Sequence, residues 1–189
     1  MDGKNDQRGM IDEMRNSFRV LHTLCSYLCV PLAVVMSKGG KIGDRYIGFP
    51  ALVGLSMQFV IVALAGGRTA GEQALVMCGL TVIALLAHRL HRSRVRRAGW
   101  RSHSMYTGEW SFPGDERAVK GIVVPVLAVL AGFGVGGFAP GVGWWLILAG
   151  VSQALCTAME QAEVRAQAQA QLDARYDQEI VARKREEMQ

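Results

Sequence analysis

The chain has 189 residues, of which 50% are hydrophobic and 20% charged, and its formal net charge at pH 7 is +5. The charged residues are concentrated at the two ends and in one internal segment, with long uncharged stretches between them. A helix of a soluble protein needs a polar face, and residues 75–86 and 122–135 offer none. The pattern argues against a soluble helical bundle and predicts an all-α, polytopic helical membrane protein.

Residues 1–37 form the first predicted region. Its apolar residues are spaced three and four apart, which places them on one face of a helix, while Arg15 and Arg19 lie on the opposite face. Such a helix is typical of the membrane interface, so we expect it to lie there or to re-enter the bilayer near Pro31. The alternative is that residues 20–37 cross the membrane. The apolar face consists of Ile11, Met14, Phe18, Leu21, Cys25, Leu28 and Leu32.

Residues 38–159 form the predicted membrane domain. The uncharged stretch at residues 46–67 provides the roughly 20 helical residues that one span requires, and residues 73–88 suffice if flanking charged side chains reach the headgroups. Residues 121–159 are nearly twice as long as one span, so this stretch must fold back, and the segment GGFAPGVGWW at residues 136–145 supplies the turn. We therefore expect four spans, or five if the first helix also crosses.

The basic segment at residues 89–120 sets the predicted orientation, because loops rich in Lys and Arg stay in the cytoplasm. The C-terminus then lies in the cytoplasm as well, as does the N-terminus if the first helix does not cross. This location explains the positive charge without a nucleic-acid partner. We expect the segment to bind anionic lipid headgroups or a partner protein through Arg92, Arg94, Arg96, Arg97, Trp100 and Arg101.

Four aromatic or imidazole side chains are expected at the level of the headgroups. Trp144 and Trp145 follow the predicted turn, where an aromatic belt would lie. His88 and His91 stand one helical turn apart at the start of the basic segment, where contact with headgroups is the simplest expectation.

No residue pattern points to an enzyme, a cofactor or a metal site. His22, Cys25 and Cys29 share one helical face, but no paired motif supplies the further ligand that tetrahedral zinc requires. Potential acid–base and nucleophilic groups gather at residues 103–109, yet no known catalytic signature surrounds them. The cysteines lie in apolar stretches, where free cysteine behaves as a small hydrophobic residue.

Uncharged polar and small residues inside the apolar stretches predict helix packing. Gln58 and Gln153 can form hydrogen bonds across helices, while Gly132 and Gly136 have the four-residue spacing that lets helix backbones approach closely. The three strongest apolar stretches contain no ionisable residue of the kind that ion-coupled transporters use. An uncharged conduit lined by the glutamines is the alternative.

Residues 160–189 are predicted to continue the last span as one cytoplasmic helix, because they contain strong helix formers and neither glycine nor proline. Apolar residues recur every four positions and form a narrow stripe that suits contact with another helix. We expect this contact to involve Leu172, Tyr176 and Ile180.

The sequence as a whole predicts a non-enzymatic membrane scaffold, anchor or accessory subunit in the cell membrane. It would act through its basic loop and its C-terminal helix, either as a homo-oligomer or within a larger complex. The alternative is a small channel or transporter subunit for an uncharged solute.

Overall fold

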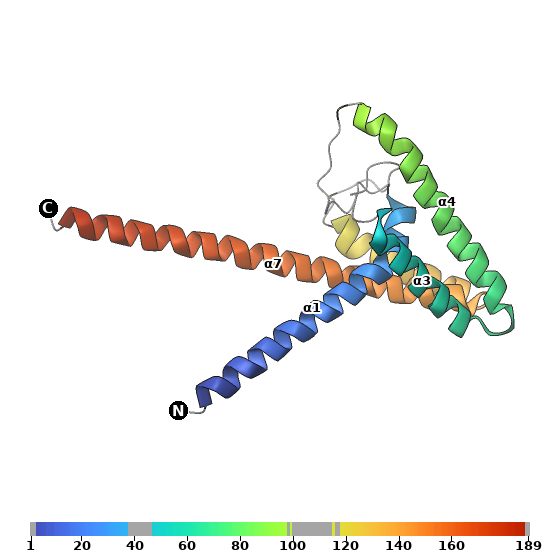
Figure 1. Ribbon diagram of the computed structural model, residues 1–189, viewed down its shortest axis with the longest axis horizontal. Helices are drawn as coiled ribbons and strands as arrows, with labels where there is room; N and C mark the ends of the chain where they lie inside the picture. Colours follow the sequence, from blue (N-terminus) through green and yellow to red (C-terminus); the bar gives the residue numbers. More distant parts are fainter. Residues whose placement is uncertain (1–2, 38–46, 98, 100–114, 116–117, 188–189) are drawn as a thin grey trace. The chain divides into compact units, whose positions relative to one another are not determined.

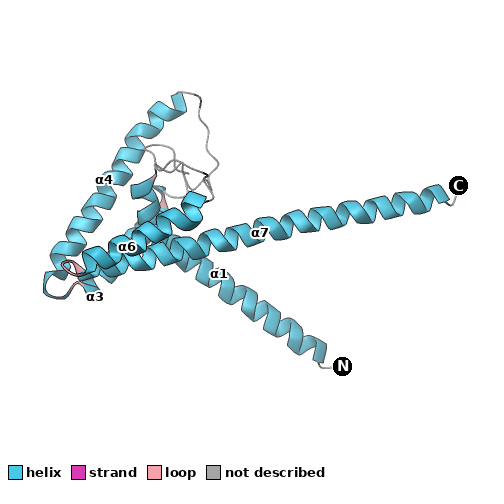
Figure 2. Cartoon of the chain, turned by 180° about the vertical axis from the view of Figure 1, so that it is seen from behind, coloured by secondary structure: helices cyan, strands magenta, loops and turns pink. Residues whose placement is uncertain are grey.

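The computed structural model describes residues 3–37, 47–97, 99, 115 and 118–187 (Figure 1). Over these residues the chain is all-α, with five α-helices and two short helical turns (Figure 2). The chain divides into two compact units, Met1–Cys156 and Thr157–Gln189. The first unit is a helical bundle, and the second consists of the remainder of the last helix.

Helix α1, Gly3–Met36, contains Pro31 in its interior. Proline has no amide hydrogen, so the carbonyl of Tyr27 lacks the usual helical partner four residues later. Gly54 of α3, Phe49–Ala65, packs against this point. A Cβ atom built on Gly54 would lie 2.7 Å from the Tyr27 oxygen and 3.0 Å from Cδ of Pro31. Only glycine therefore lets the two helices cross at this distance.

Helix α4, Ala70–Arg97, runs beside α3 after the short turn η1, Gly67–Thr69 (Figure 1). Gly67 adopts a φ of 61°, which belongs to the left-handed region that glycine tolerates best. The predicted apolar stretches at residues 46–67 and 73–88 thus become an antiparallel pair of helices joined by a tight turn.

A π-helical turn, η2 at Val119–Val123, leads directly into α6 at Val124–Gly136. Helix α7 then begins at Pro140 and ends at Glu187. The predicted fold-back is confirmed, and Pro140 opens the following helix because the first turn of a helix does not need its missing amide. The prediction of one continuous helix from the last span into the C-terminal region is also confirmed.

The core of the first unit joins side chains from all five helices, including Leu32, Val62, Ala74, Ala128 and Trp145. Trp145 is only 2% exposed, so the expectation that it lies in an aromatic belt is wrong, whereas the neighbouring Trp144 is 57% exposed. The two rings leave α7 about 100° apart, which sends one into the bundle and the other outward.

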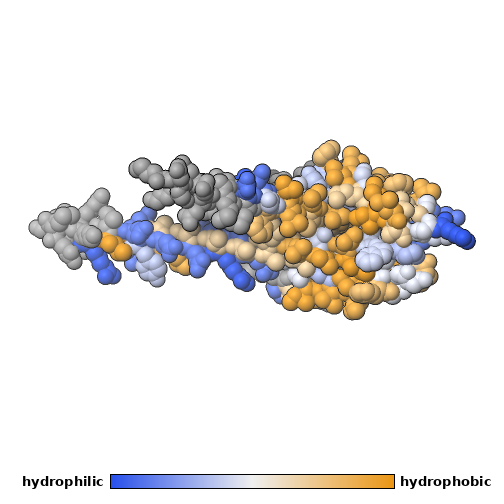
Figure 3. Space-filling model, turned by 90° about the horizontal axis from the view of Figure 1, so that it is seen from below, coloured by the Kyte–Doolittle hydropathy of each residue, from blue (hydrophilic) through white to orange (hydrophobic). Residues whose placement is uncertain are grey.

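Apolar side chains dominate the face of the first unit that Figure 3 shows. Leu64, Leu75 and Phe133 are each at least 70% exposed, and exposing so much apolar surface to water is energetically unfavourable. Among the described residues, four helical stretches are long and apolar enough to cross a membrane. A multi-pass membrane protein accounts for both observations. The four stretches are Asn16–Met36, Gly67–Arg92, Val119–Gly136 and Pro140–Ile180.

The membrane-length helices differ from the predicted set in two places. Helix α3 has 17 residues and is a shorter apolar helix, while α1 contributes a stretch of membrane length. The predicted apolar face of α1 is exposed at Phe18 and Leu21 but buried at Cys25 and Leu32. Residues 30–34 are all buried, and α1 contacts both α3 and α4. This part of α1 is therefore buried all around the helix and not along a single apolar face.

Candidate functional site: polar contacts inside the bundle

Gln58 is fully buried at the interface of α3 and α4. Its Oε1 accepts a hydrogen bond of 3.0 Å from the hydroxyl of Thr81, which is 2% exposed. The same hydroxyl lies 3.0 Å from the carbonyl oxygen of Met77, and its single proton can serve only one acceptor at a time. The sequence indicated Gln58 as a packing residue but gave no signal for Thr81, because a threonine in an apolar stretch has many other uses.

A second contact joins α4 to the end of α1. His88 Nε2 lies 2.9 Å from the carbonyl oxygen of Val34, and the side chain is only 3% exposed. The expectation that His88 contacts lipid headgroups is therefore wrong. The last carbonyls of a helix lack intrahelical partners, and His88 supplies one for Val34. The hydroxyl and the amide of Ser37 do the same for Ala33.

A third contact joins the start of α4 to the start of α7. The amide of Gly141 donates a hydrogen bond of 3.1 Å to Oε1 of Gln73, and Nε2 of Gln73 donates to the Thr69 hydroxyl at 2.6 Å. Gly141 also packs tightly on Val62 and Gly66, and a Cβ atom there would collide with both backbones. Gln73 thus caps an amide in the first turn of α7 and ties two helices together.

The predicted packing glycines lie in the hairpin of α6 and α7 (Figure 2). A Cβ atom on Gly132 would lie 2.8 Å from the carbonyl oxygen of Gly143, and one on Gly143 would lie 2.6 Å from Cα of Gly136. The structure therefore brings Gly132 and Gly136 together with Gly143, a third glycine that the four-residue spacing did not reveal. Gln153 is buried on the same helix as Gly143, at 6% exposure.

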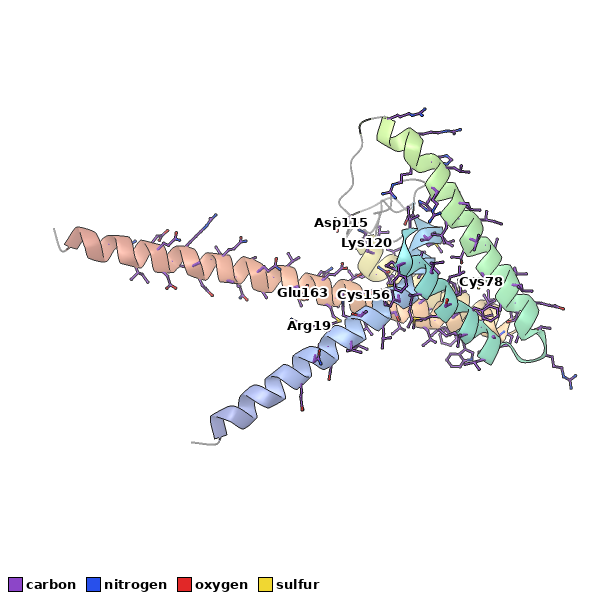
Figure 4. All side chains as sticks on the ribbon, viewed as in Figure 1. Arg19, Cys78, Asp115, Lys120, Cys156 and Glu163 are labelled. Carbon is purple, nitrogen blue, oxygen red and sulfur yellow. The ribbon has the colours of Figure 1, made fainter. Side chains whose placement is uncertain are left out.

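Three buried cysteines, Cys25, Cys29 and Cys156, pack together between α1 and α7. Figure 4 shows Cys156 on α7 beside α1. The Cys29 thiol donates a hydrogen bond of 3.0 Å to the carbonyl oxygen of Cys25. None of the four cysteines forms a disulfide, and within the described ranges no group of three or more His, Cys, Asp or Glu side chains is arranged to hold a metal ion.

Four of the basic residues proposed for lipid or partner binding lie in α4. The prediction of a loop from residue 89 is therefore wrong for residues 89–97, where arginine favours helix and neither glycine nor proline interrupts it. Arg92, Arg94, Arg96 and Arg97 occupy the last turns of α4, and Arg94 and Arg97 are exposed. Trp100 and Arg101 lie outside the described residues, as do the acid–base and nucleophilic groups at residues 103–109. Asp115 (Figure 4) lies four residues before η2, and its carboxylate accepts a hydrogen bond of 3.2 Å from the Ala118 amide.

The second unit presents the predicted partner stripe to solvent. Every residue from 162 to 180 is exposed, and Leu172, Tyr176 and Ile180 are 52%, 63% and 53% exposed. A single helix cannot bury its own apolar side chains, so this stripe has no cover within the second unit.

The chain matches no protein-family model, and no curated protein and no solved structure matches it.

Proposed function

We propose that the protein is an integral membrane scaffold, anchor or accessory subunit that recruits a partner through its C-terminal helix. The observation that carries this proposal is the exposed apolar stripe of the second unit. Val164, Leu172, Tyr176 and Ile180 are all more than half exposed on a helix that is otherwise rich in charged and amide side chains. Such a stripe is costly in water, and burial against another helix removes that cost.

The partner of this stripe is either a second copy of the chain or a helix of another subunit. Residues at every fourth position drift slowly around a helix of 3.6 residues per turn, and small residues such as Ala168 leave room for close approach. Charged residues flank the stripe and favour a defined orientation of the partner. The polar bonds inside the first unit support a fixed platform for this recruitment rather than a catalytic role.

The proposed topology places the basic segment and the C-terminal helix in the cytoplasm, because Lys and Arg are concentrated there. For α1 we favour the crossing arrangement over the interfacial one. An interfacial helix buries one face, whereas residues 30–34 of α1 are buried on all sides. Together with α3, this arrangement gives five membrane helices and an external N-terminus.

A cysteine placed at position 3 tests this topology. We expect a membrane-impermeant thiol reagent to label Gly3→Cys in intact cells, in a background where the native cysteines are replaced by serine or alanine. Labelling only after the cells are opened would contradict the crossing arrangement and restore the interfacial one.

Substitutions in the stripe test the recruitment itself. We expect Leu172→Asp with Ile180→Asp to leave the protein in the membrane but to abolish its assembly, measured by light scattering of the detergent-purified protein and by identifying the proteins that co-purify with it. Truncation after Gln161 should have the same effect. The matched control is Gln167→Asp with Gln178→Asp, which adds the same charge on the opposite face of the helix. The proposal would be refuted if the stripe variant kept the oligomer size and the co-purifying proteins of the wild type.

A small conduit for an uncharged solute is the second candidate function. The observation in its favour is the amide nitrogen of Gln58, which is buried in the bundle without a hydrogen-bond partner among the described residues. Buried polar groups are usually satisfied, so an unpaired donor suits a passing or bound polar molecule. The test measures uptake of glycerol or urea into vesicles that contain the protein. Uptake that the Gln58→Leu, Gln153→Leu variant loses would support the conduit, and no uptake by the wild type would exclude it.

A further inference from the structure

A groove lies between α3 and α4 at the end of the pair that carries the basic residues. It encloses a cavity of about 430 Å³, which falls within the range of small-molecule sites. Its walls are apolar and include Leu52 and Leu55 of α3 and Val82 and Leu86 of α4. Leu52 and Leu86 are 65% and 53% exposed, so the groove is open at the side of the helix pair. Its shape and lining suit a hydrocarbon chain.

Among the described residues that line this groove, Arg89 alone is charged. Its side chain is exposed, and Nη2 lies 3.4 Å from the carbonyl oxygen of Ile47, just before α3 begins. A guanidinium group has five donors in a fork that matches phosphate oxygens, and one long contact to a carbonyl leaves most of them for a ligand. The positive end of the α3 dipole points to the same end of the groove.

We propose that the groove binds one anionic phospholipid, with an acyl chain between Leu52 and Leu86 and the phosphate on Arg89. The apolar walls suit the acyl chain, and the guanidinium group of Arg89 suits the phosphate. A small polar solute would leave the leucines uncovered, while a neutral lipid would bring no net charge to Arg89. In a membrane the ligand is already present at high concentration. This proposal is independent of the scaffold function, because the groove lies in the first unit and the partner stripe in the second.

The test measures lipid binding to the full chain purified in a mild detergent. Phosphatidylglycerol and phosphatidylcholine with the same acyl chains are titrated separately, and bound lipid is counted by native mass spectrometry. We expect one saturable site that prefers phosphatidylglycerol. Arg89→Gln should weaken phosphatidylglycerol binding about tenfold and remove the preference between the two lipids, because it removes one charge-assisted contact. Leu52→Trp should fill the groove and weaken the binding of both lipids.

Each variant has a matched control on an exposed position outside the groove. Arg68→Gln removes the same charge at the opposite end of the α3–α4 pair, and Leu90→Trp places the same bulk at a leucine that is 73% exposed. Both controls should bind phosphatidylglycerol like the wild type. Equal losses in Arg89→Gln and Arg68→Gln would show a diffuse charge effect and overturn the proposal. Wild-type binding in Leu52→Trp, or displacement of the lipid by millimolar inorganic phosphate alone, would show that no acyl chain occupies the groove and would also overturn it.

Discussion

The hydroxyl of Thr81 in α4 donates a hydrogen bond of 3.0 Å to Oε1 of Gln58 in α3, and both side chains are completely or almost completely buried. This bond is a polar link at the centre of the pair of helices that also forms the lipid groove. In a hydrocarbon environment such bonds typically contribute about 0.6 to 2 kcal/mol. The link therefore fixes the register of α3 against α4 more than it adds to total stability.

Replacing Thr81 by valine tests this link. We expect Thr81→Val to lower the free energy of unfolding by about 1–2 kcal/mol, because the Gln58 amide then loses its cross-helix partner. Thermal or denaturant unfolding of the detergent-solubilised protein measures the change. In a Gln58→Leu background the same substitution should have little effect, and an equal loss in both backgrounds would contradict the link. Ser56→Ala is the control, since Ser56 is exposed and bonds only to Leu52 of its own helix.

A methyl group on Gly54 should separate α1 from α3. The added carbon would meet the Tyr27 carbonyl oxygen at 2.7 Å, and a backbone atom cannot move aside as a flexible side chain can. We expect Gly54→Ala to lower the unfolding free energy by about 1–3 kcal/mol. Gly79→Ala in α4 is the control, because open space surrounds Gly79 and alanine favours helix by about 1 kcal/mol. Destabilisation by both substitutions alike would argue against the close crossing.

A bulky residue at Gly132 should disrupt the hairpin of α6 and α7. In Gly132→Leu together with Gly136→Leu, the new side chain at Gly132 would meet Ile147 and the Gly143 carbonyl oxygen, whereas no atom lies within 4 Å of a Cβ position on Gly136. We expect normal membrane insertion but lower thermal stability in detergent, and unchanged stability would exclude the contact. Gly134→Leu is the control, because Gly134 is exposed and has no atom near its Cβ position.

Removal of the His88 ring should loosen the end of α1. We expect His88→Ala to speed hydrogen exchange of the amides in residues 30–36 and to lower the unfolding free energy by about 1–3 kcal/mol, because Val34 loses its side-chain partner and a cavity remains. His91→Ala is the control, since His91 is exposed one turn later. If the exchange rates stay at wild-type values, the bond contributes nothing to holding α1.

The existence of the helices was predictable from the long apolar stretches, and the fold-back near Pro140 followed from the length of residues 121–159 together with the glycines and the proline of the turn. The end of α4 was not predicted, because the helix continues through the charged residues to Arg97. Burial was harder to predict. His88 and Trp145 stand beside residues that face outward, and a shift of one position around a helix decides between core and surface. Residues such as Thr81, Gly143 and Cys156 find their partners on other helices, and those contacts depend on how the helices cross, which no local pattern records.

The hairpin of α6 and α7 has a consequence for how the protein enters the membrane. Three residues, Gly137 to Ala139, separate the helices, and residues 121–159 contain no acidic or basic side chain. Moving the turn across the bilayer therefore transfers no ionic charge. The close backbone contact at Gly132 lets the two helices pack against each other while they insert. The pair can enter as one unit during biogenesis. Lys120 precedes this uncharged stretch and Glu160 follows it, and either charge would be costly to move through the hydrocarbon.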